Sequence, residues 1–127
     1  MAGILIVDED EAIRVLAQSI LEEHNHSTFS ATTPDQAAAL LESGRDINLL
    51  FTETELQGEI QSGLEFAREA VRRRPDLAVL YTSAGALTDG MKELFVEKSA
   101  FLPKPYTVDQ LITTLVAHFG MRESASA

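Results

Sequence analysis

Acidic side chains follow two apolar runs of the sequence, and a lysine follows a third. Asp8 and Glu9 come directly after the first run, Glu53 after the second and Lys104 after the third. Carboxylates held about 4–6 Å apart repel one another by several kcal/mol unless solvent, an ammonium group or a bound cation offsets the repulsion. Mg²⁺ prefers oxygen ligands and often takes one or two carboxylates together with water. We therefore expect a magnesium site formed by Asp8, Glu9, Glu53 and Glu55, with Lys104 supplying a fixed positive charge.

Thr82 lies at the end of a further apolar run, residues 77–81. Its hydroxyl can donate a hydrogen bond to an anion held between the carboxylates and the lysine. Taken singly, each of these residues has an ordinary interpretation; Asp10, for example, has the residue type of a helix N-cap. Their occurrence at four expected strand ends favours a shared site, because parallel strands bring their carboxyl ends to one edge of a sheet.

Apolar runs that suit buried strands alternate with segments of helical periodicity. Strands are expected at residues 4–7, 28–31, 48–52, 77–81 and 100–102. Helices are expected at residues 11–24, from Thr33 to a stop at Gly44, from Ser62 to near Pro75, at 88–98, and from Thr107 to Gly120. Ser62 and Glu65 have the spacing of a capping box. This order predicts a doubly wound α/β fold, with a five-stranded parallel sheet in the order 2-1-3-4-5 and helices on both faces.

The bulk composition narrows the classes of function. The chain has 127 residues, enough for one domain, which we place at residues 1–121 with a disordered tail at 122–127. Its formal net charge of −10 argues against a nucleic-acid partner, whose phosphates need clustered cations. The sequence has no apolar run of membrane-spanning length and no cysteine, so we expect a cytoplasmic protein without membrane contact or disulfides.

Over essentially its whole length, the sequence resembles the receiver domain of two-component response regulators. The matching segments are Ile-Leu-Ile-Val-Asp-Glu at 4–9, Val-Leu-Tyr-Thr-Ser at 79–83 and, most specifically, Phe-Leu-Pro-Lys-Pro-Tyr at 101–106. The resemblance implies a flavodoxin-like receiver fold and a signalling role in a phosphorelay rather than an enzyme activity. It implies as partners a histidine kinase or phosphotransfer protein, or an output protein. A homodimer through the fourth helix, fifth strand and fifth helix would also fit the family.

The resemblance also implies roles for individual residues. In the family, the acidic pair matching Asp8 and Glu9 binds Mg²⁺, and an aspartate at the end of the third strand takes a phosphoryl group. Thr82 and Lys104 would contact that group, and Phe101 would swing inward when the threonine moves. The bond between Lys104 and Pro105 is expected to be cis.

Glu53 departs from this pattern, because it stands where the family has the phosphoacceptor aspartate. The chain reads Glu-Thr-Glu-Leu-Gln-Gly at 53–58, without the usual proline. A glutamate carboxylate lies farther into the pocket, and a displacement of about 1 Å can slow in-line transfer roughly 100-fold. Three outcomes stay open: Glu53 pairs with Lys104 and imperfectly mimics phosphorylation, the domain is a pseudo-receiver without a switch, or Glu53 is an unusual acceptor.

Two rival families share parts of the pattern. Asp8-Glu9-Asp10 resembles the Asp-x-Asp motif of haloacid-dehalogenase phosphatases, but Glu11 stands where that family has glycine or threonine, and no second acidic pair follows. A flavodoxin-like nucleotide binder would need a phosphate loop after the first strand, where residues 8–13 are acidic instead. The three histidines, His24, His26 and His118, show no metal-ligand spacing and are expected at the surface.

Overall fold

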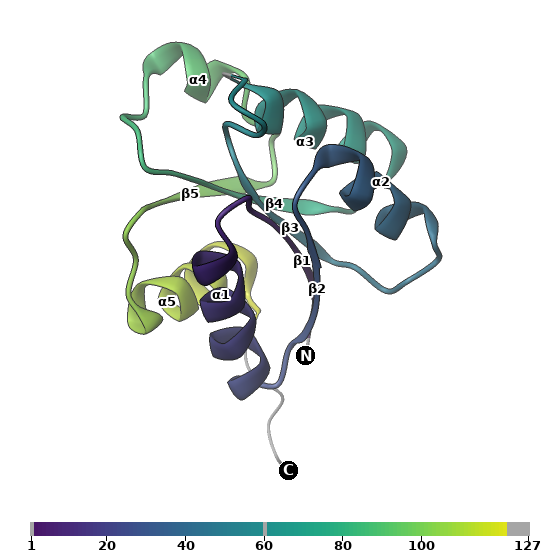
Figure 1. The fold of residues 1–127 in the computed structure, drawn as a ribbon, viewed down its shortest axis with the longest axis vertical. Helices are drawn as coiled ribbons and strands as arrows, with labels where there is room; N and C mark the ends of the chain where they lie inside the picture. Colours follow the sequence, from purple (N-terminus) through teal and green to yellow (C-terminus); the bar gives the residue numbers. More distant parts are fainter. Residues whose placement is uncertain (1, 60, 122–127) are drawn as a thin grey trace.

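Five strands alternate with five helices in the part of the chain that the structure describes (Figure 1). The computed structural model describes residues 2–59 and 61–121, so the expected tail at 122–127 lies outside the described residues. The strands are β1 (Gly3–Val7), β2 (Ser27–Ala31), β3 (Leu49–Glu53), β4 (Ala78–Ser83) and β5 (Ser99–Pro103). The helices are α1 (Glu11–Glu23), α2 (Pro34–Glu42), α3 (Ser62–Arg73), α4 (Asp89–Glu93) and α5 (Val108–Phe119). Within these residues, none of the helices combines the length and apolar character needed to span a membrane.

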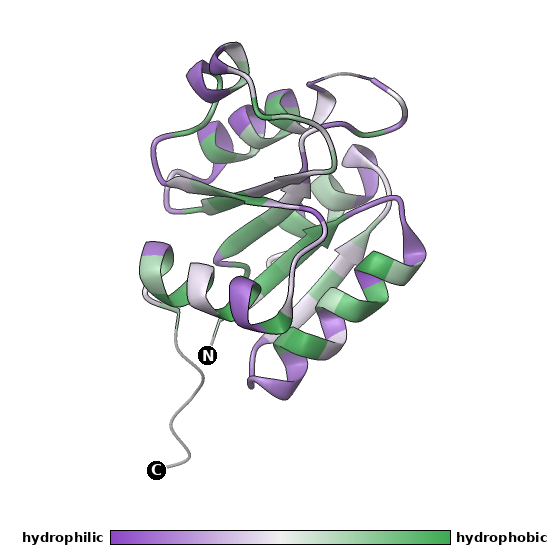
Figure 2. Cartoon of the chain, turned by 90° about the vertical axis from the view of Figure 1, so that its left-hand side faces the viewer, coloured by the Kyte–Doolittle hydropathy of each residue, from purple (hydrophilic) through white to green (hydrophobic). Residues whose placement is uncertain are grey.

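All neighbouring strands are parallel, and their order is β2-β1-β3-β4-β5, which confirms the predicted fold. Helices α1 and α5 cover one face of the sheet, and α2, α3 and α4 lie on the other side (Figure 1). The three central strands are apolar on both faces because helices cover both. Figure 2 shows these strands as predominantly hydrophobic, while the helices contain both hydrophilic and hydrophobic residues.

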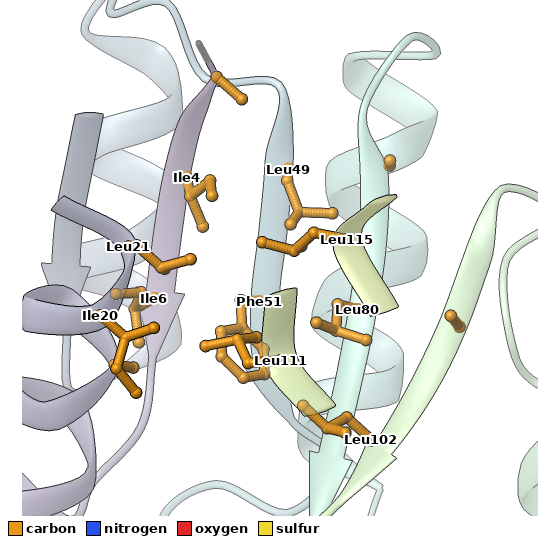
Figure 3. Close-up of a cluster of buried hydrophobic side chains, with 14 residues drawn as sticks. Ile4, Ile6, Ile20, Leu21, Leu49, Phe51, Leu80, Leu102, Leu111 and Leu115 are labelled. Atoms are coloured by element: carbon orange, nitrogen blue, oxygen red, sulfur yellow. The ribbon is translucent and has the colours of Figure 1, made fainter. Parts of the chain in front are cut away.

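Among the described residues, the core consists of two apolar clusters, one on each face of the sheet. Ile4, Phe51 and Leu80 belong to the cluster under α1 and α5, where Leu111 and Leu115 pack against them (Figure 3). The residues that alternate with these along the same strands point to the other cluster. Complete burial of one large apolar side chain contributes about 1.5–3 kcal/mol. Two such clusters hold the central strands rigidly and fix the positions of their carboxyl ends.

Several predicted helix starts are confirmed. The Asp10 carboxylate caps α1 by accepting hydrogen bonds from the N–H groups of Ala12 and Ile13. The Thr33 hydroxyl caps α2, and Thr107 forms a complete capping box with Gln110 at the start of α5.

Helix α3 begins at Ser62 as predicted, but its cap and the end of α4 differ from the prediction. The predicted capping box at Ser62 is wrong, because its hydroxyl donates to the carbonyl oxygen of Leu56 and accepts from the Leu56 N–H. Helix α3 instead follows Gln61, which has a positive φ of 70° and no side-chain cap. The helix expected at 88–98 ends at Glu93, and beyond it the Val96 N–H donates to the Tyr81 hydroxyl of β4.

One expectation about the histidines is also wrong. His26 is buried, with 5% of its surface exposed, and its Nδ1 atom accepts a hydrogen bond from the Ala2 N–H. The ring therefore joins the start of β1 to the start of β2. His118 is exposed, as expected.

Candidate functional site

Three charged side chains meet at the carboxyl edge of the sheet. Lys104 Nζ lies 2.8 Å from Glu53 Oε2 and 2.9 Å from Asp8 Oδ2. The Asp8 side chain is 3% exposed, that of Lys104 9% and that of Glu53 18%. The structure therefore brings together the predicted residues from the ends of β1, β3 and β5, and their pairing is shielded from water.

The sheet register places these side chains. Glu53 is the last residue of β3 and lies opposite Thr82 of β4. Lys104 follows β5 directly, and its N–H donates to the carbonyl oxygen of Ser83 at 3.0 Å. The peptide bond between Lys104 and Pro105 is cis, as expected. Strand pairing alone thus brings both members of the Glu53–Lys104 ion pair to the same edge.

Gly63 allows α3 to begin directly beside the backbone of Glu53. A Cβ atom at Gly63 would lie 1.7 Å from the Glu53 carbonyl oxygen. The Gly63 N–H also donates to the carbonyl oxygen of Thr54 at 2.9 Å. A larger residue would have to push the end of β3 away from the helix, so this glycine contributes to the position of the site.

The remaining carboxylate oxygens bond to backbone N–H groups. Asp8 Oδ1 accepts from Asp10 at 2.8 Å, and Glu53 Oε1 accepts from Glu9 at 3.2 Å. The Glu9 carboxylate accepts from the N–H of Gln57 in the loop after β3. Glu9 is therefore joined to the loop rather than to the ion pairs of Lys104.

The predicted magnesium ligands have suitable chemistry, but they do not converge as a ligand set. Asp8 and Glu53 share Lys104, Glu9 bonds to the loop, and Glu55 is exposed. Within residues 2–59 and 61–121, no three or more acidic, histidine or cysteine side chains are grouped so that they could hold a metal ion. As arranged here, the residues do not fit an Mg²⁺ ion, because the ammonium group of Lys104 pairs with both the Asp8 and the Glu53 carboxylate.

The environment shifts the pKa values of the ion-paired groups. Burial raises the pKa of Glu53 above its usual range and the charge of Asp8 adds to this rise, against the opposing hydrogen bond from Lys104. Burial lowers the pKa of Lys104, but its hydrogen bonds to Glu53 and Asp8 outweigh that effect and raise it overall. Burial and the same two carboxylates raise the pKa of Tyr106. With both carboxylates ionised, the site carries one more negative charge than positive.

The Thr82 hydroxyl is buried beside the ion pairs but takes no part in them. The residue is 2% exposed, and within the described part of the chain its Oγ1 has no hydrogen-bond partner. An unpaired buried hydroxyl costs about 1–3 kcal/mol. The Glu53 side chain, although opposite Thr82 in the register, is directed to Lys104 and Glu9 instead.

Phe101 belongs to a row of three aromatic rings next to the site. The Tyr81 and Phe95 rings stack with their centroids 4.2 Å apart, and the Phe95 and Phe101 centroids lie 6.3 Å apart. The Tyr81 hydroxyl accepts a hydrogen bond from the Val96 N–H at 3.1 Å. We did not predict this role for Tyr81. The available signal was a tyrosine in an otherwise aliphatic buried strand, since a buried hydroxyl usually has a partner.

A family model of the response regulator receiver domain matches residues 4–116. The chain belongs to this family. The receiver domain is 32% identical over 110 residues to the nitrogen assimilation regulatory protein NtrX of Azorhizobium caulinodans, a match that covers 86% of the chain and 24% of that protein. It is 24% identical to the sensor kinase CckA of Brucella abortus, over 90% of the chain and 12% of that protein.

Solved structures agree with this assignment. A response regulator receiver protein from Sinorhizobium medicae has a TM-score of 0.81 and 25% identity to this receiver domain, covering 96% of the chain and 97% of its own. NtrX from Brucella abortus has a TM-score of 0.78 and 30% identity, covering 90% of the chain and 26% of its own. The receiver domain thus spans about a quarter of the NtrX proteins it matches. The family match gives no support to the phosphatase or nucleotide-binder interpretations.

Proposed function

We propose that this receiver domain acts through protein–protein contacts that do not depend on ordinary phosphorylation, because Glu53 stands in place of the phosphoacceptor aspartate. The observation that carries this proposal is the Glu53 carboxylate itself, held by Lys104 at 2.8 Å and by the Glu9 N–H at 3.2 Å. Both of its oxygens are therefore bonded. In-line attack on a phosphoryl donor would require this carboxylate to break the ion pair and turn toward the donor.

The arrangement favours a pseudo-receiver over a mimic of the phosphorylated state. A full mimic would have to engage both anion contacts expected from the family, Lys104 and Thr82. Glu53 engages Lys104 only, and the Thr82 hydroxyl has no partner in the described structure. One carboxylate also carries less charge than the nearly two of a phosphoryl group. The domain would accordingly keep a single conformation, and its partners would bind that conformation directly.

Magnesium binding in this pocket is proposed to be weaker than in an aspartate pocket. An added Mg²⁺ ion would have to displace the Lys104 ammonium group from Asp8 and Glu53 and draw Glu9 away from Gln57. Each displacement costs an ion pair or a hydrogen bond that the bound ion must replace. We therefore propose that the domain is a binding module and is not a metal-dependent enzyme.

The partners we propose are proteins of two-component signalling: a histidine kinase or phosphotransfer protein, or an output protein. A homodimer through α4, β5 and α5 is a further candidate. The relatives include a sensor kinase and a nitrogen regulatory protein that are much longer than this chain. We therefore propose that the output function lies either in a further part of the same protein or in a separate protein.

The experiment that tests the proposal compares conformational response in the wild type and Glu53→Asp. Amide spectra of both proteins are recorded by NMR before and after addition of acetyl phosphate and Mg²⁺. We expect no donor-dependent change in the wild type and changes around Thr82 and Phe101 in the variant. Donor-dependent shifts at Thr82 in the wild type would contradict a pseudo-receiver.

A further inference from the structure

The segment between α4 and β5 is held by side chains of two neighbouring strands. Val96 donates its N–H to the Tyr81 hydroxyl at 3.1 Å, and its carbonyl oxygen accepts from the Ser99 hydroxyl at 2.6 Å. The preceding residue, Phe95, stacks on the Tyr81 ring. Both backbone polar groups of Val96 are thus satisfied from outside α4.

Tyr81 takes the place of a helical acceptor. In a continuing α-helix, the Val96 N–H would donate to the carbonyl oxygen of Lys92, four residues earlier. That oxygen instead accepts from Phe95 at 3.1 Å, and Leu94 donates to Met91 at 3.0 Å. These three-residue spacings tighten the chain and end the helix.

Nothing in the local sequence requires α4 to stop where it does. Residues 91–98 contain neither glycine nor proline, and Lys92, Glu93 and Leu94 are good helix formers. Their apolar residues also keep the helical spacing that predicted a helix to residue 98. The early end of α4 therefore comes from tertiary contacts. The hydrogen bond and the ring stack with Tyr81 compete here with the further hydrogen bonds of a longer helix. The free energies of these interactions are similar in magnitude.

We propose that residues 94–97 have two arrangements, one docked on Tyr81 and one that continues α4, and that the Tyr81 hydroxyl decides between them. The choice alters the outer surface, because Leu94 and Val96 line a hollow together with Arg68 and Val71 of α3. Tyr81 directly precedes Thr82, near the carboxyl end of β4. The choice between the two arrangements does not require Glu53 to accept a phosphoryl group.

The test is Tyr81→Phe in the full chain, which removes the hydroxyl and keeps the ring. Cα and carbonyl chemical shifts of residues 94–97 are measured by NMR. We expect non-helical values in the wild type and a shift toward helical values in the variant. Loss of one hydrogen bond should raise the ratio of helical to docked molecules about fivefold. Tyr106→Phe is the matched control, because it removes the chain's other tyrosine hydroxyl and should leave these shifts unchanged.

Phe95→Leu provides a second test, since it removes the ring stack and retains a good helix former. It should move the chemical shifts of the same residues toward helical values. Unchanged shifts in Tyr81→Phe would overturn the proposal. Movement toward random-coil values would overturn it as well, because the segment would then have only one ordered arrangement. Loss of the folded spectrum in both variants would show that the contact supports the whole sheet, which also contradicts the proposal.

Discussion

The Lys104 ammonium group lies 2.8 Å from the Glu53 carboxylate, and the pair closes the carboxyl edge of the sheet between β3 and β5. Asp8 completes the cluster at 2.9 Å. A pocket that would otherwise hold two repelling carboxylates contains its own cation, and this relationship governs stability, pH response and metal binding.

Removal of Lys104 should destabilise the domain. Lys104→Met leaves the buried Asp8 and the partly buried Glu53 without a counter-ion, and breaking a buried ion pair from one side costs about 3–5 kcal/mol. We expect a loss toward the lower end of that range, because the Glu53 side chain is 18% exposed. Urea unfolding at pH 7 measures the free energy of unfolding. Lys98→Met, at an exposed position, is the control, and equal losses in the two variants would contradict the role assigned to the pair.

Glu53 should make stability fall as pH rises through its titration. Its pKa is raised in the folded state above the ordinary value of 4.5, chiefly by burial, so the folded protein binds this proton more tightly than the unfolded chain. Its contribution is fully present below pH 4.5 and is lost as pH rises through the folded pKa. Glu53→Gln removes this titration. We expect the stability of the variant relative to the wild type to be greater at pH 7 than at pH 4, as measured by urea unfolding, and the reverse order would contradict the shift.

Magnesium should stabilise the lysine variant more than the wild type. In Lys104→Met the carboxylates of Asp8 and Glu53 lose the ammonium group that pairs with both of them. A cation that binds only the folded state raises the free energy of unfolding by RT ln(1 + [L]/Kd). We expect Mg²⁺ to raise the melting temperature of Lys104→Met clearly and that of the wild type little. An equal rise in both proteins would show that Lys104 does not compete with the ion.

Gly63→Ala should destabilise the domain by displacing the backbone of Glu53. The added Cβ atom would lie 1.7 Å from the Glu53 carbonyl oxygen, so β3 or α3 must move. Overpacking typically costs about 1–3 kcal/mol, and a backbone clash belongs at the upper end. Gly85→Ala is a suitable control, because its nearest contact is the Ser83 hydroxyl at 3.5 Å. Similar unfolding free energies for the two variants would contradict a special role for Gly63.

The fold and the charged cluster could be predicted because they follow from short-range patterns. Buried strands, helix caps such as Asp10 and Thr107, and the parallel order together fix which residues reach the carboxyl edge. The structure differs from the prediction where a residue distant in the sequence forms a hydrogen bond with a group that was expected to bond locally. Tyr81 takes the N–H that would extend α4, and Leu56 takes the hydroxyl that would cap α3. The direction of the Glu9 side chain toward Gln57 is likewise a tertiary result.

The most direct test of phosphorylation independence is covalent. The wild type and Glu53→Asp are incubated with acetyl phosphate and Mg²⁺ and examined by intact mass spectrometry. We expect no phosphoryl adduct on the wild type and an adduct at position 53 of the variant, because the aspartate side chain introduced there is shorter and free to attack. A stable adduct mapped to Glu53 in the wild type would contradict the account.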